Sequence, residues 1–553
     1  MVMKFAGKKM RKIISLAISA ALIFALTIQT GAPTFAAESG KTWPSFRGDP
    51  VSKGISDSVT PRTAKQTAKN WSVNLDPGST NAPATNPVIY NGKIYIATAL
   101  GDPAFGPSTA GKITAYNSSG KKVMEKAFPS TVGISYSSSL AYGDGKIFVP
   151  VFDSKTKEAR VIAFSASNLK QLWTSASLPA DYEIVSSLVY RSGYIYGGSS
   201  FGWDASSTQG CFFALSAKDA DTSRSDETVP FKWTYTSAKA AKGYYMAGCV
   251  FTKKAVFFAG DDGTLVSHSL TSNQAPIATY AMNGPVRSDL YIKNNVIYAT
   301  TQAGSLYRIP VSDSGKISAS KVKKVALPGK ASTSSPVVYG KKVYVVSGQS
   351  SFVLGEAKGK GYLNAYNAST LKKLSQVALG EFSQSSLLLS SGYASKTTKN
   401  TVNLYVLLNA DKDNVICVED NDSLKTPKKR TLYTPGGSFT ATSLLADNKG
   451  NLYFVHSITT NPVTYATSSE LVSIGTKKAT VKFNVNGGKK LKTASKKAVY
   501  GNRIGSLPKP SYKNSGKVFA GWYTKKKGGV RVTENTIIKS TKARTYYARW
   551  RNK

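Results

Sequence analysis

The sequence predicts an all-β chain, in which a repeat-built, eight-bladed β-propeller with N-terminal strand closure precedes a small C-terminal domain. Three observations carry this prediction. A two-strand apolar pattern recurs eight times, an unpartnered strand precedes the first copy, and the composition includes 30 Tyr, 22 Phe and 46 Gly. Aromatic side chains suit pleated surfaces and Gly accepts positive φ in tight turns. A chain of 553 residues also exceeds what one non-repetitive core usually serves.

The repeat begins with small or polar residues and continues as an apolar strand, a turn and a second strand that carries Tyr or Phe. In the first copy, residues 86–96, the turn is Asn91-Gly92, a strong signal for a two-residue hairpin. The copies lie 41 to 61 residues apart. The first apolar residues of their second strands are Ile94, Ile147, Ile195, Val256, Ile297, Val343, Leu404 and Leu452.

Two further strands follow each hairpin. A third strand, such as residues 111–117, opens after Gly, and a fourth carries an aromatic or aliphatic residue, as Trp173 and Trp233 do. Four strands per repeat are typical of propeller blades. The eighth copy ends with its third strand at Ile474. We therefore expect the strand around Trp71 to complete the last blade and remove an exposed edge.

The pattern resembles the family of propellers with pyrroloquinoline-quinone-enzyme-like (PQQ-like) repeats. The matches are the opening W-P-S-F-R-G-D at residues 43–49 and the third strands A-F-S-A, A-L-S-A and A-Y-N-A at residues 163–166, 214–217 and 365–368. The resemblance covers residues 42–475. It places Trp173 and Trp233 at blade-docking positions, but several repeats lack this Trp, so binding of the quinone is not implied.

The composition changes at the C-terminus, where residues 476–553 hold 17 Lys and 5 Arg against one acid, Glu534. The ordered motifs V-K-F-N-V-N-G-G, F-A-G-W-Y-T and Y-Y-A-R-W resemble one copy of the Listeria–Bacteroides repeat, also called the internalin B-repeat. The resemblance implies a β-grasp-like module of extracellular bacterial proteins. We expect its core to use Phe483, Phe519, Trp522, Tyr547 and Trp550. Its lysines either form a solvated face or bind an anionic wall polymer or nucleic acid.

The N-terminus has the features of a signal peptide at residues 1–37. Basic residues at positions 4, 8, 9, 11 and 12 precede an apolar run at residues 13–28 and small residues before position 37. An uncleaved anchor is the alternative reading. No Cys lies near the cleavage point, which argues against lipoprotein processing. The sequence thus predicts export, a propeller at residues 42–475 and the repeat at residues 476–553.

Cys211, Cys249 and Cys417 do not form the even, dense set of a disulfide framework. Each lies beside apolar strand residues, so we expect buried free thiols, while a bridge between Cys211 and Cys249 stays open. His268 and His456 are the only histidines and are expected to be structural.

Two short motifs invite functional readings that we do not adopt. Asp261-Asp262-Gly263 lacks the spaced acids of a calcium loop and is expected to be a blade turn. Arg47-Gly48-Asp49 spells an integrin-type tripeptide, but it belongs to the family-like opening. Residues 436–438 and the insert at residues 393–401 are expected in connections that rim a propeller face, where ligands usually bind.

We assign no catalytic residue, metal ligand or cofactor, and the sequence identifies no cofactor-binding residue. Quinone enzymes of the propeller family use an adjacent Cys pair and calcium ligands, and this chain has no adjacent Cys pair.

The net charge of +43 favours anionic partners. We expect a secreted or cell-surface, non-enzymatic binding or adhesion protein of a Gram-positive bacterium. Its partner would be an anionic cell-wall polymer or an extracellular protein or glycan, with no specific nucleic acid and no transmembrane segment after signal removal. The alternatives are an exported quinone-dependent or other propeller enzyme and an envelope assembly scaffold.

Overall fold

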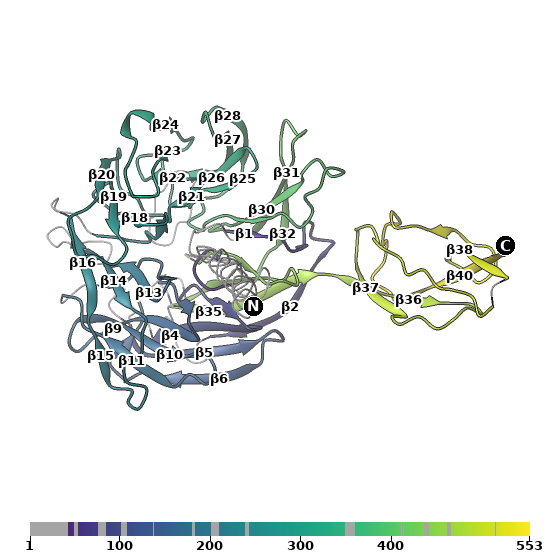
Figure 1. The fold of residues 1–553 in the computed structure, drawn as a ribbon, viewed down its shortest axis with the longest axis horizontal. Coiled ribbons are helices and arrows are strands. Elements are labelled where there is room, and N and C mark those ends of the chain that lie inside the picture. The colour runs from purple at the N-terminus through teal and green to yellow at the C-terminus, as the bar shows by residue number, and fades with distance from the viewer. Residues whose placement is uncertain are drawn as a thin grey trace, which may run out of the picture. The chain divides into compact units, whose positions relative to one another are not determined.

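The computed structural model describes residues 43–48, 54–75, 84–100, 108–135, 138–179, 183–200, 210–237, 243–348, 360–410, 412, 414–435, 442–461, 466–514 and 516–553. The predicted signal peptide, Asp49 and residues 436–438 lie outside the described residues. The described chain is all-β, apart from one short 3₁₀-helix, η1 (Ala319–Lys321). Figure 1 shows its sheets following one another around a ring in chain order, as in a propeller.

Eight sheets of the described chain correspond to the eight sequence repeats, and neighbouring strands within each are mostly antiparallel. The first four are built from β3 (Val88–Tyr90), β4 (Lys93–Leu100), β5 (Thr109–Asn117) and β6 (Lys122–Ala127); β7 (Val132–Gly133), β8 (Ala141–Gly143), β9 (Lys146–Asp153), β10 (Glu158–Ser165), β11 (Gln171–Ser175) and β15 (Glu227–Val229); β12 (Val189–Arg191), β13 (Tyr194–Gly198), β14 (Cys211–Ser216) and β16 (Phe231–Thr236); and β17 (Cys249–Phe251), β18 (Ala255–Ala259), β19 (Thr264–Ser269) and β20 (Ala278–Ala281).

The other four sheets continue the ring. They are built from β21 (Tyr291–Lys293), β22 (Val296–Thr301), β23 (Ser305–Pro310) and β24 (Lys323–Ala326); β25 (Val337–Tyr339), β26 (Lys342–Gly348), β27 (Gly361–Asn367) and β28 (Lys373–Ala378); β1 (Ile55–Ser56), β29 (Leu388–Ser390), β30 (Val402–Leu407), β31 (Val415–Asp420) and β32 (Lys428–Tyr433); and β33 (Leu445–Ala446), β34 (Leu452–Asn461), β35 (Ala466–Thr476) and β2 (Thr67–Asn74).

The N-terminal strand closes the ring as expected. β2 pairs antiparallel with β35, with Trp71 opposite Ser473, so the eighth sheet takes its outer strand from the start of the chain (Figure 1). The Trp71 indole donates a hydrogen bond of 3.0 Å to the Ser118 carbonyl in the β5–β6 turn of the first sheet. Pairing the two ends of the repeat array in this way satisfies the backbone groups of β35 that would otherwise form an open edge.

The hydrophobic core lies between neighbouring sheets. One cluster joins Val88 and Tyr95 of the first sheet to Ile147 of the second, and comparable clusters fill the other inter-sheet spaces. Several second-strand tyrosines add a hydrogen bond across the same spaces. Tyr95 donates to the Ala166 carbonyl at 2.7 Å and Tyr298 to the Ala368 carbonyl at 2.8 Å. The Tyr of the repeat therefore buries its ring and still satisfies its hydroxyl.

A belt of small polar residues links the starts of the innermost strands, through main-chain bridges in the first three repeats and through side-chain hydrogen bonds elsewhere. We call it the polar belt, and it comprises Asn86, Ser139, Ser187, Asp289, Ser335, Ser386 and Ser443. Ser443 donates its amide to the Asn86 side chain at 2.9 Å, which joins the last sheet to the first. These links explain the small polar residues at the repeat starts, because their short side chains accept hydrogen bonds from main-chain amides of the neighbouring repeat.

The polar belt crosses the fourth sheet through a glycine. Asp289 of the fifth repeat accepts a hydrogen bond of 2.9 Å from Ser187 of the third. A Cβ at Gly248 would lie 2.2 Å from the Asp289 carboxylate oxygen. Gly248 thus leaves the space through which the third and fifth repeats contact each other.

The C-terminal module is a five-stranded sheet with the order β37-β36-β40-β38-β39. Its strands are β36 (Lys478–Asn484), β37 (Ser495–Val499), β38 (Lys517–Tyr523), β39 (Arg531–Val532) and β40 (Arg544–Asn552). The first and last strands, β36 and β40, are parallel neighbours, which is the β-grasp arrangement. One face covers a core that includes Phe483, Trp522 and Tyr546, with Phe519 and Trp550 partly buried against it. Tyr547, which we expected in this core, lies in β40 between buried neighbours and is only half-buried.

Candidate functional site

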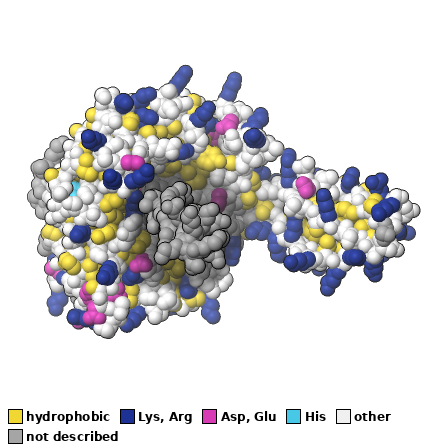
Figure 2. Space-filling view, viewed as in Figure 1, with side chains coloured by type: hydrophobic (Ala, Val, Ile, Leu, Met, Phe, Trp, Pro, Cys, Tyr) yellow, Lys and Arg dark blue, Asp and Glu magenta, His cyan; other side chains and the backbone are white. Residues whose placement is uncertain are grey.

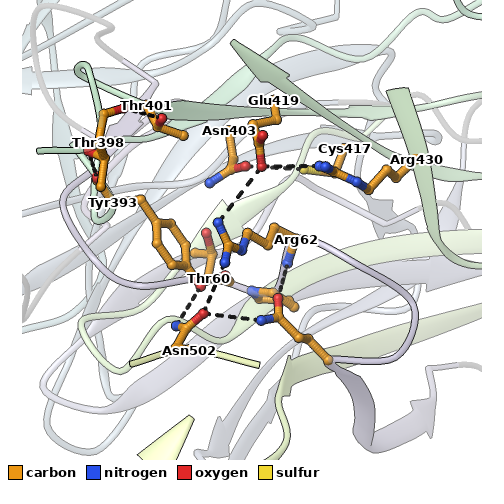
Figure 3. Close-up of polar contacts among 12 residues, drawn as sticks. Thr60, Arg62, Tyr393, Thr398, Thr401, Asn403, Cys417, Glu419, Arg430 and Asn502 are labelled. Carbon is orange, nitrogen blue, oxygen red and sulfur yellow. Dashed lines mark hydrogen bonds and ion pairs between the residues drawn. The ribbon is translucent and has the colours of Figure 1, made fainter. Parts of the chain in front are cut away.

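A cluster of polar side chains gathers where the segment before β2, the seventh sheet and the module meet. We call it the junction cluster, and it comprises Thr60, Arg62, Gln66, Tyr393, Glu419, Arg430 and Asn502 (Figure 3). A cleft of about 480 Å³ opens beside it. Since these residues come from three distant parts of the sequence, the fold alone brings them together.

The side chains of Gln66 and Asn502 take part in the hydrogen bonds that connect this cluster to the module. Gln66 donates its side-chain amide to the Tyr500 carbonyl at 2.9 Å and to the Asn502 side chain at 3.2 Å. Asn502 donates in turn to the Tyr393 hydroxyl at 3.1 Å. The Lys477 amide donates to the Gln66 main-chain carbonyl at 2.7 Å, which continues the strand-like contact just past β35.

The junction cluster and the cleft beside it carry more positive than negative charge. Glu419 pairs with Arg430 at 3.2 Å and with Arg62 at 3.8 Å, and the Arg62 guanidinium lies 4.6 Å from the centre of the Tyr393 ring. Burial raises the pKa of Tyr393, so this phenol stays neutral near pH 7. Lys65 and Lys539 also line the cleft. The arrangement can attract an anion, but one carboxylate among four cations offers no acid–base pair for catalysis.

The insert at residues 393–401 lies between β29 and β30, as the sequence predicted. It is held by its own contacts, including hydrogen bonds from Thr398 to the Tyr393 carbonyl at 2.6 Å and from Thr401 to the Thr398 carbonyl at 2.5 Å. Tyr393 donates its hydroxyl to the Thr60 carbonyl at 3.1 Å. The first residue of the insert therefore supports the junction cluster.

The three cysteines are free, buried and placed on three different sheets. Burial raises the pKa of Cys211 and raises that of Cys249 well above its ordinary value. Burial likewise raises the pKa of Cys417 to about 12. Cys417 lies beneath the junction cluster, with its thiol 3.7 Å from the Asn403 side-chain oxygen (Figure 3). These protonated thiols are poor nucleophiles, and Cys211 and Cys249 are not bridged.

Both histidines lie inside the sheets. His268 packs 4.2 Å from the Trp233 ring, and its Nδ1 is 3.0 Å from the Ser269 carbonyl oxygen. His456, in β34, is 2% exposed, and neither ring nitrogen has a hydrogen-bond partner in the described part of the chain. Burial, with a smaller contribution from Lys69, lowers the pKa of His456 to about 4.

Asp261 and Asp262 are engaged within the fold. Asp261 forms a two-pronged ion pair with Arg287, both N–O distances being 2.9 Å. Asp262 accepts the Thr264 amide at 2.8 Å, and Gly263 has φ +71. Among the described residues, no group of three or more His, Cys, Asp or Glu side chains could hold a metal ion.

The family-like opening crosses the inner strands of several sheets. Trp43 bridges to Ile89, and the Pro44 carbonyl accepts the Tyr142 amide at 2.6 Å. Arg47 is buried and donates to the Pro336 carbonyl at 2.8 Å. Arg47 therefore supports the fold, and it is not available to a receptor.

A second polar group lies where the inner strands begin. Arg287, besides pairing with Asp261, lies 5.1 Å from the Tyr245 ring centre. Tyr245 interacts electrostatically with Glu183. Burial raises the pKa of Glu183, against the effect of a hydrogen bond from Ser135. These contacts tie the fourth and fifth repeats together through the Asp261–Arg287 ion pair.

The comparisons with known proteins agree with this architecture. Residues 480–549 match the family model of the Listeria-Bacteroides repeat domain. A europium-containing methanol dehydrogenase superposes with a TM-score of 0.56 at 9% identity, over 79% of this chain and 98% of that one. No curated protein sequence matches the chain.

Two further solved structures share the fold. The quinohemoprotein alcohol dehydrogenase of Comamonas testosteroni has a TM-score of 0.55 at 14% identity, over 80% of this chain and 82% of that one. The quinohemoprotein alcohol dehydrogenase ADHIIG of Pseudomonas putida HK5 has a TM-score of 0.54 at 11% identity, over 86% and 85%. At these identities the likeness shows the fold alone: the chain has the β-propeller fold of these dehydrogenases, and its residues 480–549 match the Listeria–Bacteroides repeat.

The described residues do not fit the quinone and calcium of such enzymes. The three thiols are separate, buried and protonated, and the described ranges contain no group of three or more His, Cys, Asp or Glu side chains that could hold a metal ion. We derive no reaction step through that cofactor. Within the same ranges, no helix is long and apolar enough to cross a membrane.

Sequence reasoning missed the junction cluster. Arg62, Gln66 and Asn502 lie in connections without a motif, and their contacts span more than 400 positions of the sequence. The only local signal was Gly501, whose φ of +78 marks the turn that brings Tyr500 and Asn502 against Gln66. A glycine of this kind is common in any β protein, so it could not have identified a site.

Proposed function

We propose that this protein is a secreted, envelope-associated binding protein of a Gram-positive bacterium. Its propeller, at residues 42–475, would be the interaction platform, and the basic module at residues 476–553 would hold it to an anionic polymer. The supporting observation is the charge of the module, 22 cationic residues against the single acid Glu534 on a folded five-stranded sheet. Figure 2 shows basic side chains spread over the module surface with little acid between them.

The proposal depends on the positive electrostatic field of the module. Lysines outside an apolar core are exposed, as Lys482, Lys489 and Lys492 are, and attract an anionic polymer over a distance set by salt. A signal peptide at residues 1–37, which stays a prediction, would place the protein outside the membrane. The Listeria–Bacteroides repeat is typical of bacterial surface proteins, which supports such a location.

Co-sedimentation of the full mature chain with anionic cell walls over a salt series tests the proposal. We expect binding at low salt and release near 1 M salt, and no binding to walls stripped of their anionic polymer. Binding that survives both 1 M salt and the stripping would contradict the proposal.

A matched pair of full-length variants separates the module from the propeller. The module variant changes six lysines to Gln at positions 478, 482, 489, 490, 492 and 497. The control variant changes six exposed lysines of the propeller to Gln at positions 122, 126, 323, 324, 372 and 373. We expect the module variant to lose wall binding and the control to keep it. Equal loss in both would assign the attraction to net charge alone.

An exported quinone-dependent enzyme is the second candidate, and the shared dehydrogenase fold favours it. Binding of a ligand to the native state raises its stability. An unchanged melting temperature with the quinone and calcium would remove this candidate. An envelope assembly scaffold is the third candidate, and self-association or capture of a defined envelope protein would be needed to support it.

A further inference from the structure

The uncovered face of the module sheet is a cationic surface without an acidic residue. Side chains alternate between the two faces of a strand, and the positions between the buried core residues face outward. The cross-strand pairs place Tyr523 opposite both Arg531 and Tyr547, and Gly521 opposite Arg549. The cations on this face are Lys478, Lys482, Lys497, Arg531, Arg549 and Arg551.

Two arginines lie beside Tyr523 on this face. The Arg549 guanidinium lies 4.0 Å from the Tyr523 ring centre. A Cβ at Gly521 would lie 3.1 Å from the Arg531 Nε and 3.5 Å from the Tyr523 ring. Gly521, with φ +138, therefore leaves room for the Arg531 side chain and the edge of the Tyr523 ring.

No carboxylate balances these two arginines. None of the ion pairs among the described residues includes Arg531 or Arg549, although Arg549 donates to the Gly528 carbonyl. Two arginines beside one tyrosine thus carry positive charge without a carboxylate partner, and planar guanidinium groups suit the oxygens of a phosphate.

We propose that this face binds a phosphodiester-linked wall polymer, with Arg531 and Arg549 holding one phosphate and the lysine row of β36 and β37 contacting the next units of the chain. This inference rests on the proposed function and specifies its ligand. Neighbouring strands lie about 4.8 Å apart, so cations on successive strands can follow a polymer that crosses them.

The geometry favours a sugar or polyol phosphate polymer over a nucleic acid. Single-stranded nucleic acids bind through bases stacked on open aromatic faces. On this surface, the Tyr523 ring is already covered by the Arg549 guanidinium, and Tyr547 is half-buried. A polymer without bases needs only the cations, which this face supplies.

The test measures the affinity of the full mature chain for poly(glycerol phosphate) at fixed salt. R531Q/R549Q should weaken binding at least tenfold. The matched control K525Q/K526Q removes the same charge from an exposed turn of the same module and should change affinity less than threefold. R531K/R549K keeps the charge without the planar fork and should also weaken binding, which shows that geometry contributes. Circular dichroism and melting temperature confirm folding of each variant.

The outcomes separate this inference from the proposed function. Equal weakening by R531Q/R549Q and K525Q/K526Q would overturn the specific face and leave wall association intact. Wild-type protein that binds neither the polymer nor cell walls would overturn the proposed function. Polyglutamate or single-stranded DNA that binds as tightly as poly(glycerol phosphate) would overturn the assignment of the ligand class.

Discussion

Burial decides the chemistry of individual residues in this protein. The three cysteines and His456 are reactive types, yet each is enclosed by sheet residues. A charged form is costly in such surroundings, so the thiols stay protonated and the imidazole stays neutral. Their apolar sequence neighbours, as in Val415-Ile416-Cys417-Val418, already predicted this placement.

The cysteines give the first prediction. In the native protein at pH 8, a thiol reagent should label none of the three cysteines over the time in which a free peptide thiol reacts fully, because their raised pKa values and burial suppress the thiolate. Three equivalents should react in denaturant. Rapid labelling of even one thiol in the native state would contradict this expectation.

His456 gives a prediction about pH. Its folded pKa of about 4 lies below the ordinary value of 6.5. As pH falls through this window the unfolded chain takes up a proton that the folded chain does not, so stability decreases. We expect the free energy of unfolding to fall by about 2 kcal/mol between pH 7 and pH 5 because of His456. This figure follows from about 1.4 kcal/mol for each pKa unit of difference between the folded and unfolded states.

Denaturant unfolding of the wild type and H456F at both pH values measures this effect. The wild type should lose more stability than the variant, since Phe cannot take up the proton. A variant with the same pH dependence as the wild type would show that other groups control it.

The elements of the propeller depend on contacts between successive repeats. Each sheet contributes half of an inter-sheet core, and the polar belt adds hydrogen bonds between inner strands. The sequence predicted the strands because alternation and turn residues are local. It did not predict the belt partners, since Ser187 and Asp289 are 102 positions apart.

The belt gives a prediction at this scale. G248A should lower the melting temperature, corresponding to a loss of about 1–3 kcal/mol, because the added Cβ displaces the buried Asp289 carboxylate from Ser187. G516A should be nearly neutral, since no atom lies within 4 Å of a Cβ at Gly516. Equal melting temperatures for G248A and the wild type would show that the belt tolerates this displacement.

At the scale of the whole molecule, the junction cluster ties the module to the end of the repeat array. The link from β35 to β36 is a single residue, Lys477, whose amide is bonded to Gln66. The Gln66 side chain adds two hydrogen bonds to the module. A short, hydrogen-bonded connection of this kind opens only by local unfolding.

Limited trypsin digestion tests this connection. The native chain should resist cleavage after Lys477 and Lys478 while the exposed run at residues 525–527 is cut readily. Q66A should speed cleavage at the connection several-fold and leave cleavage at residues 525–527 unchanged. Equal rates at both places in the wild type would argue against an ordered junction.

The sequence by itself determined the repeated hairpins, the closing strand around Trp71, the buried thiols and the basic module. These features are encoded by alternation, turn residues and local composition, which act between near neighbours in the chain. Only the tertiary structure decided which distant residues meet: Gln66 with Asn502, Ser187 with Asp289, and Arg549 with Tyr523. The physical reason is that sheet register and chain closure set these contacts, and no local pattern encodes them.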